Sequence, residues 1–270
     1  MIPKIIIHIL LILGCIVTLY PFIWMFLSSF KSSGMVMSLP PQFFPKQPTI
    51  ENYKIIFSDD VGLYFWNSSY IAILRTAFPV YTSVLLGYIF DKFKFKGKNA
   101  IFALFISTMM LPWIVTIIPL YNLFNIAGLL NSHIALILPF ICSGYGIYLM
   151  KSFMHQVPLS LMESARIDGC GEFKIFNRIV FPLVTPAIAA LGILLFLSAW
   201  DDYLWPLLVL NNEKLFTLTV GLSRYAFKHY FIDYGPVIAG SVISIVPVIV
   251  VYFIFQKNIV QGISLAGVKG

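Results

Sequence analysis

The chain has 270 residues, of which 59% are hydrophobic and 11% are charged, and its formal net charge is +7. Soluble proteins are about 45–50% apolar and about 25% charged, so this chain has too few charged side chains to cover the surface of a water-soluble globule. The composition excludes an ordinary soluble enzyme and argues against a nucleic-acid binder despite the positive charge. We expect a lipid bilayer around the chain.

Stretches without Asp, Glu, Lys or Arg are long enough for helices of about 20 residues that cross a bilayer. Residues 99–150 form the longest of them. As one helix they would run roughly 78 Å, against a hydrocarbon core of about 30 Å, so they must form two spans, with a turn in the polar segment 122–132. The first stretch is too long for the apolar region of a signal peptide, and we expect it to stay attached. An all-α integral membrane protein with six spans is predicted, as a single transmembrane domain over residues 1–270, with spans at 6–30, 67–90, 101–121, 133–152, 183–205 and 235–256.

The positions of Lys and Arg predict the orientation, because these residues concentrate in short cytoplasmic loops. With the N-terminus inside the cell, eleven of the 18 Lys and Arg residues are cytoplasmic, and Arg75 lies within the second span. Both termini are therefore predicted to be cytoplasmic, with a cytoplasmic loop over residues 153–182. The chain is expected to be a multi-pass protein of the cell membrane.

Signals for chemistry are lacking. Cys15, Cys142 and Cys170 match neither a disulfide framework nor a zinc site, so free thiols are expected. The histidines form no HExxH or H-x-x-x-H pair, and the chain has no G-x-x-x-x-G-K-[ST] phosphate-binding motif. We expect no catalytic residue, no metal and no cofactor bound by this chain.

The loop over residues 153–182 predicts two short helices. Pro158 suits the first position of a helix, and Gly169 suits the residue just past a helix end, where a positive φ is needed. Apolar residues then recur at helical spacing until Pro182 stops or kinks the chain. The residues of this second apolar face are Phe173, Phe176 and Ile179 with Val180.

The first of these helices is too short to be stable alone in water, so its apolar side must pack against something. That side consists of Leu161, Met162 and Ala165, while Glu163 and Arg166 lie one turn apart on the surface. The apolar side could meet the chain's own helix ends or a partner protein, and spacing alone favours the chain itself.

The segment from Glu163 to Gly169, followed by Pro182 and Pro186, resembles the EAA loop of binding-protein-dependent ABC-transporter permeases. In that family the E-A-A-x-x-x-G motif forms a coupling helix that sits in a cleft of the ATPase subunit. The resemblance covers nearly the whole chain and is strongest to carbohydrate-uptake permeases of the maltose type. It departs at Ser164 and Asp202, and the other matching stretches are 48–53, Asn67 with Ser68, 92–98, 118–121, 199–206 and 256–270.

The resemblance implies a type I ABC importer permease fold in a lipid bilayer. Its implied partners are a second homologous permease, an ABC ATPase dimer that carries ATP and Mg²⁺, and an extracellular sugar-binding protein, with no nucleic acid. The implied ATPase-coupling residues are Glu163, Ser164, Ala165, Arg166, Asp168 and Gly169. An ATPase-contacting tail would contain Gln261, Gly262, Lys269 and Gly270, with a frayed terminus as the alternative.

Candidate pathway residues are few. Arg75 would cost about 2.5–3.5 kcal/mol at mid-bilayer, so it should be paired, reach a surface or serve the translocation path. The fourth span offers Ser143, Tyr145 and Tyr148, which suit a sugar site, beside glycines that equally suit close helix packing.

Two features near the outer surface leave alternatives open. Trp200 and Trp205 are expected to be interfacial anchors, while the roles of Asp201 and Asp202 stay undecided. The proline-rich loop 31–66 suits a packed outer loop or a docking surface.

We therefore predict an importer subunit that carries a carbohydrate inward by alternating access, driven by ATP on its partners. The alternative is a stand-alone ion-coupled secondary transporter. That class commonly uses acidic or histidine relays within the membrane, and the predicted spans hold no acidic residue away from their ends.

Overall fold

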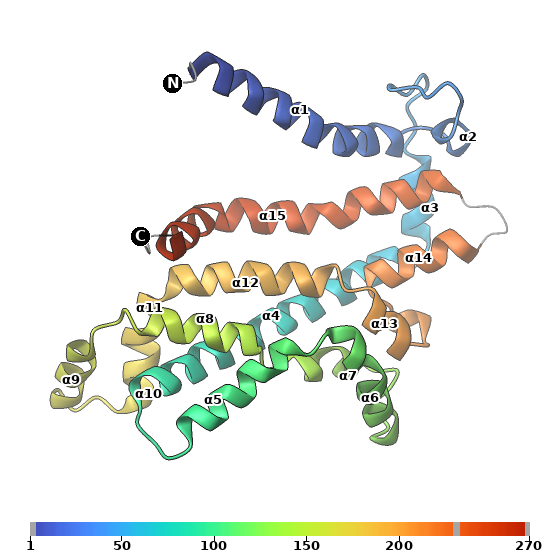
Figure 1. The fold of residues 1–270 in the computed structure, drawn as a ribbon. Coiled ribbons are helices and arrows are strands. Elements are labelled where there is room, and N and C mark those ends of the chain that lie inside the picture. Colours follow the sequence, from blue (N-terminus) through green and yellow to red (C-terminus); the bar gives the residue numbers. More distant parts are fainter. Residues whose placement is uncertain (1–3, 229–232, 268–270) are drawn as a thin grey trace. The chain divides into compact units, whose positions relative to one another are not determined.

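The computed structural model describes residues 4–228 and 233–267, and every regular element in these two ranges is a helix (Figure 1). The α-helices are α1 (Lys4–Ser29), α2 (Ser33–Val36), α3 (Glu51–Ser58), α4 (Val61–Lys92), α5 (Lys98–Ser107), α6 (Trp113–Ile126), α7 (His133–Ile137), α8 (Gly144–Met154), α9 (Leu159–Ile167), α10 (Glu172–Ile175), α11 (Phe181–Leu183), α12 (Thr185–Trp200), α13 (Leu204–Val209), α14 (Leu218–Lys228) and α15 (Tyr234–Gly267). The short 3₁₀ segments are η1 (Thr108–Met110), η2 (Leu138–Phe140) and η4 (Glu213–Leu215), and η3 (Phe176–Val180) is a π-helix.

Backbone contacts divide the chain into two compact units, where the sequence led us to expect one domain. The first unit consists of Met1–Trp66 and Thr217–Pro247, and it contains α1 to α3 and α14. The second consists of Asn67–Phe216 and Val248–Gly270, and it contains α5 to α13. Helices α4 and α15 each contribute to both units.

Three helices of the described chain, α1, α4 and α15, are each long and apolar enough to cross a membrane. Three helix pairs pass the same test only together, and they bend where they join: α5–η1 with α6 by 105°, α7–η2 with α8 by 41°, and residues 172–183 with α12 by 79°. Counted as one span each, the pairs bring the described residues to six spans. The predicted all-α, six-span fold is confirmed.

The third span departs most from its predicted form, one helix over residues 101–121. Leu111 is extended (φ −82°, ψ 118°), because a proline disfavours the helical conformation of the residue before it, and Pro112 follows. Helix α6 then continues to Ile126. The turn expected over residues 122–132 therefore begins later than predicted.

The fifth span bends at a proline. Pro186 has no N–H to donate to the carbonyl of Pro182, four residues earlier, and the hydroxyl of Thr185 donates to that carbonyl over 2.8 Å instead. Helix α12 ends at Trp200, so the span predicted over 183–205 is shorter, and the chain continues into the separate helix α13.

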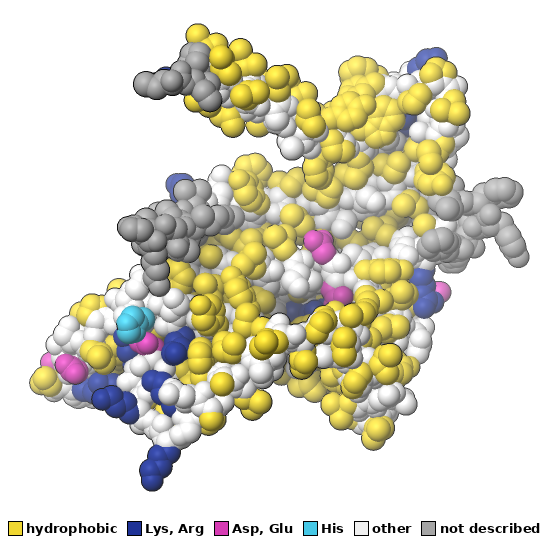
Figure 2. Space-filling model, viewed as in Figure 1, with side chains coloured by type: hydrophobic (Ala, Val, Ile, Leu, Met, Phe, Trp, Pro, Cys, Tyr) yellow, Lys and Arg dark blue, Asp and Glu magenta, His cyan; other side chains and the backbone are white. Residues whose placement is uncertain are grey.

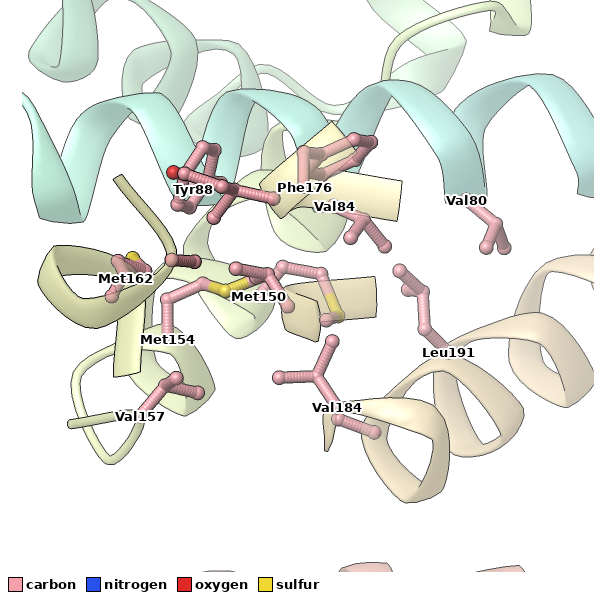
Figure 3. Packing of buried hydrophobic residues seen from close by; sticks show 14 residues of the cluster. Val80, Val84, Tyr88, Met150, Met154, Val157, Met162, Phe176, Val184 and Leu191 are labelled. Atoms are coloured by element: carbon pink, nitrogen blue, oxygen red, sulfur yellow. The ribbon is translucent and has the colours of Figure 1, made fainter. Parts of the chain in front are cut away.

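The hydrophobic core of the second unit lies where α4, α8, α9, η3 and the start of α12 meet (Figure 3). Tyr88 of α4 packs on Phe176 of η3, with 5.6 Å between ring centroids. Helices α4 and α8 approach closely at Gly87, where a Cβ would come within 2.9 Å of the backbone of Met150. This core joins the loop between the fourth and fifth spans to three membrane helices.

In the first unit, the loop after α1 is packed rather than free. The side-chain N–H groups of Asn52 donate to the carbonyls of Ser29 and Lys31, both at 2.7 Å. Lys31 is buried, and its Nζ donates to Ser28 Oγ (3.0 Å) and to the carbonyl of Gln42 (2.5 Å). These bonds hold α3 and the proline-rich segment against the end of α1.

Candidate functional site

Helix α9 carries the predicted coupling residues. Pro158 precedes the helix in an extended conformation (ψ 133°), one position earlier than predicted. The helix ends as predicted at Gly169, whose φ is 77°. The N–H groups of Gly169 and Cys170 donate to carbonyls of the last turn at 3.0 and 2.9 Å, the Schellman pattern of helix termination. The prediction of a sharp exit at a positive φ is confirmed.

One side of α9 packs on its own chain. Met162 is fully buried and Ala165 is 6% exposed, both within the core of the second unit. Leu161 was predicted to share this side but is 43% exposed. Neighbouring residues point about 100° apart around a helix, so Leu161 and Met162 do not face the same surface. Internal packing is confirmed for Met162 and Ala165, whereas Leu161 does not join them in the chain's own core.

The other side of α9 and the start of α10 form an exposed apolar tip. Ile167 is 86% exposed and Phe173 is 72% exposed. Of the apolar face predicted for the second short helix, Phe176 and Val180 are buried, but Phe173 is not, and Ile175 is buried with them. Exposed large apolar side chains that cluster at one place indicate a contact surface. Further predicted coupling residues exposed beside them are Glu163, Ser164, Arg166 and Asp168.

Arg166 pairs with Glu172 of α10, although Glu163 lies one turn before it. Arg166 Nε donates to Glu172 Oε1 over 2.5 Å and Arg166 Nη2 to Oε2 over 3.3 Å. The hydroxyl of Tyr88 also donates to Glu172 Oε2, over 3.0 Å. The hydrogen bonds from Arg166 are the main reason why the pKa of Glu172 lies below its ordinary value. Glu172 thus links the coupling loop to α4, a role that sequence reasoning missed because Tyr88 is 84 residues away.

A second ion pair lies deep in the same unit. Arg75 Nη1 of α4 lies 2.6 Å from Asp202 Oδ2, and the two side chains are 4% and 15% exposed. The guanidinium of Arg75 also lies 3.7 Å from the ring centre of Phe140. Pairing, one alternative for Arg75, is confirmed, and it gives Asp202 a structural role. Asp201 is exposed.

The candidate pathway residues of α8 have unequal roles. Ser143 Oγ accepts a hydrogen bond from the Gly146 N–H over 3.0 Å, so it caps the helix. Tyr145 and Tyr148 are 42% and 53% exposed, and both can offer a ring to a solute. A Cβ at Gly144 would come within 2.5 Å of a carbonyl oxygen of α5. This glycine therefore allows close packing of α5 and α8.

The prediction that Trp200 and Trp205 are interfacial anchors is wrong. They are 2% and 0% exposed, and Trp205 Nε1 donates to the carbonyl of Ala135 over 2.9 Å. Asn67, another position of the sequence resemblance, donates its side-chain N–H groups to two carbonyls of the segment 214–216, both at 3.0 Å. These motif positions therefore hold helices together.

The predicted C-terminal tail contact and the expected absence of a metal site can be compared with the structure only in part. The backbone of α15 is helical to Gly267, past the predicted end of the sixth span. Only the backbone of Gln261 and Gly262 is described, and Lys269 and Gly270 lie wholly outside the described residues, so the tail contact stays a prediction. Among the side chains that are described, no three His, Cys, Asp or Glu residues gather as metal ligands.

Sequence comparison shows what the chain is similar to. Residues 83–265 match the family described as the binding-protein-dependent transport system inner membrane component. The arabinooligosaccharides transport system permease protein AraQ of Bacillus subtilis (strain 168) is 37% identical over 256 residues, which cover 93% of this chain and 91% of the relative. The lactose transport system permease protein LacG of Rhizobium radiobacter is 34% identical over 268 residues, or 99% and 97% of the two chains.

Comparison with solved structures shows that two chains of ABC transporters share the fold of this chain. A chain of a bacterial ABC transporter involved in the import of the acidic polysaccharide alginate superposes with a TM-score of 0.84 at 24% identity, and the match covers 94% of this chain and 95% of the other. A chain of a bacterial alginate ABC transporter in complex with an alginate pentasaccharide-bound periplasmic protein superposes with a TM-score of 0.60 at 16% identity, over 95% and 94% of the two chains.

Proposed function

Because this chain belongs to the binding-protein-dependent transport system inner membrane components, we propose that it forms half of a translocation pathway with a second, homologous permease. The chain is a membrane permease subunit of an ABC importer for a carbohydrate. The observation that carries this conclusion is similarity along almost the whole chain to permeases named for arabinooligosaccharides and lactose.

In this proposal an ABC ATPase dimer supplies the energy, and ATP and Mg²⁺ bind there. The exposed tip of α9 and α10 is the contact surface, with Ile167 and Phe173 as apolar anchors and Glu163 beside them. The Schellman exit at Gly169 supports this assignment, because it holds the end of α9 in one conformation. The tail after residue 256 adds a second contact.

The coupling loop is suited to transmit force because it is part of a packed core. Met162 and Ala165 lie in one cluster with residues of α4, α8 and α12. Close-packed interiors resist compression, so a displacement of α9 is passed on to these helices. The ATPase therefore needs to hold only the exposed side of α9 to move three spans.

The first helix supports the proposal of a permease partner. Apolar side chains of α1 are exposed along its length, with Leu10 at 61% and Val17 at 71%. Lipid and the second permease would cover this surface. On the outer side, an extracellular sugar-binding protein delivers the solute.

For the solute path, Tyr145 and Tyr148 are the candidates for ring contacts on α8, and Ser143 orients the start of that helix. Arg75 serves the path indirectly, by fixing α4 to the end of α12 through Asp202. We assign it as a positioning residue.

The test is reconstitution of the chain in vesicles with the second permease, the ATPase and the binding protein. Labelled oligosaccharide should accumulate only when ATP is present on the ATPase side. Uptake driven by a proton or sodium gradient in vesicles without the ATPase would instead support the stand-alone secondary transporter.

A further inference from the structure

A hollow with both polar and apolar lining lies at one end of the second unit, apart from the α9 tip. It has a cavity volume of about 320 Å³ and lies at the ends of α4, α5 and α8 that the Lys and Arg distribution assigns to the cytoplasmic side. Phe102 of α5 forms its apolar wall. The remaining lining residues are Asp91, Tyr148, Lys151, Ser152, His155 and Gln156.

The acidic side chain in the hollow is already neutralised. Asp91 Oδ2 lies 2.9 Å from Lys92 Nζ, and Asp91 Oδ1 lies 3.2 Å from His155 Nδ1. Lys151 Nζ lies 4.0 Å from the ring centre of Phe102, and no carboxylate of the described residues is within ion-pair distance of it. The hollow therefore presents one uncompensated ammonium group.

The loop beside the hollow adds positive charge. Residues 92–98 carry four lysines, of which Lys94 and Lys96 are exposed. Figure 2 shows Lys and Arg side chains gathered at this end of the unit. Lysine clusters directly cytoplasmic of a membrane helix attract anionic lipids, and basic pockets between such helices hold anionic headgroups.

Helix α5 also carries exposed apolar side chains on a different face from Phe102. Ile101 and Leu104 are 44% and 68% exposed on this membrane helix. Because lipid surrounds this membrane helix, the anionic group closest at hand for the hollow is a lipid headgroup. Ser152 and Gln156 add uncharged groups that can donate hydrogen bonds to phosphate oxygens.

We propose that this hollow binds the headgroup of an anionic glycerophospholipid of the inner leaflet, with the phosphate beside Lys151 and the acyl chains in the surrounding bilayer. The site goes beyond the transport function, because it needs neither the solute nor the ATPase. It would fix the ends of α4 and α8, which approach closely at Gly87, at the depth of the headgroups.

The test uses the full transporter complex in detergent, with native mass spectrometry to count bound lipids during titration with dioleoyl phosphatidylglycerol or dioleoyl phosphatidylcholine. The complex should prefer phosphatidylglycerol, and Lys151→Gln should weaken its binding roughly fivefold. Lys151→Arg keeps the charge and should restore the binding. The matched control, Lys174→Gln, removes an exposed lysine outside the hollow and should leave it unchanged.

Several results would overturn the proposal. Equal weakening by Lys151→Gln and Lys174→Gln would mean that only the overall surface charge matters. The absence of any preference for phosphatidylglycerol would show that the hollow does not recognise an anionic headgroup. Displacement of the bound lipid by millimolar inorganic phosphate would assign the hollow to free phosphate, and its displacement by oligosaccharide would assign it to the solute path.

Discussion

The hydroxyl of Tyr88 and the carboxylate of Glu172 are joined by a hydrogen bond of 3.0 Å, so a residue of the second span and a residue of the coupling loop share one contact. Glu172→Gln keeps the shape of the side chain but removes the charge that Arg166 and Tyr88 recognise. A hydrogen bond to a charged group contributes about 1.5–3 kcal/mol when buried, but solvent screens the exposed pair with Arg166, so we expect about 1 kcal/mol here. We expect sugar uptake per ATP hydrolysed to fall roughly fivefold.

The control for this measurement is Glu213→Gln, because Glu213 is an exposed glutamate outside the coupling loop. Tyr88→Phe should reproduce part of the loss, since it removes one of the bonds to Glu172. Unchanged coupling in both Glu172→Gln and Tyr88→Phe, at normal membrane levels, would show that the contact does not transmit force.

Gly169→Val should prevent the exit of α9. A β-branched residue at a φ of 77° is strained by roughly 1–2 kcal/mol or more. Gly171→Val is the matched control, because Gly171 has a φ of −70° and a Cβ there meets nothing within 4 Å. Co-purification of the ATPase and sugar uptake should drop for Gly169→Val alone, with both variants at normal membrane level. Similar behaviour of the two variants would contradict the role of the left-handed turn.

Ile167→Asp should separate docking from folding. The side chain is 86% exposed, so the substitution leaves the core intact and places a charge on the proposed ATPase contact. We expect normal membrane level with weak retention of the ATPase. Met162→Ala should instead lower the membrane level, because truncation of a buried methionine to alanine costs about 2–5 kcal/mol of stability. The ATPase contact itself is not altered by this variant. Full ATPase retention by Ile167→Asp would show that the ATPase does not contact this side chain.

Removal of one partner of the Arg75 and Asp202 pair should be worse than removal of both. A lone buried charge costs about 3–5 kcal/mol, while replacement of both partners is often near neutral. Arg75→Gln and Asp202→Asn should each lower the melting temperature of the purified complex, and the double variant should recover part of the loss. Additive losses would show that the two groups act independently.

The orientation can be tested with single cysteines after replacement of Cys15, Cys142 and Cys170. Cysteines at Lys96 and Lys174 should resist a membrane-impermeant thiol reagent in intact cells, because both positions are predicted to be cytoplasmic. A cysteine at Lys46, which is exposed and predicted to lie outside, should react. Labelling of a cysteine at position 96 or 174 in intact cells would show that the predicted orientation is wrong.

Features with a local cause could be predicted from the sequence. The six apolar spans follow from composition, and the exit at Gly169 follows from the conformational freedom of glycine. The sequence did not predict which side of each short helix is buried. Leu161 and Met162 are both apolar, and only the position of the core decides that Met162 is buried.

Long-range partners could not be predicted. Trp200 and Trp205 fit the pattern of interfacial anchors, but their burial depends on elements distant in the chain, such as the carbonyl of Ala135 that accepts from Trp205. Arg75 is 127 residues from Asp202, and one sequence gives no signal for that pair. Pairing of Arg166 with Glu172 rather than Glu163 depends on the turn between α9 and α10.

The bend in the fifth span has a mechanical consequence. Residues 172–183 and α12 meet at 79° with no loop between them, so together they have the shape of a crank. Rotation of the first arm about its own axis swings the second arm sideways. Helix α12 has 16 residues and is about 24 Å long, so a rotation of about 10° carries its far end by about 4 Å. A small rotation of the arm beside the coupling helix would therefore move the far end of α12 sideways within the membrane.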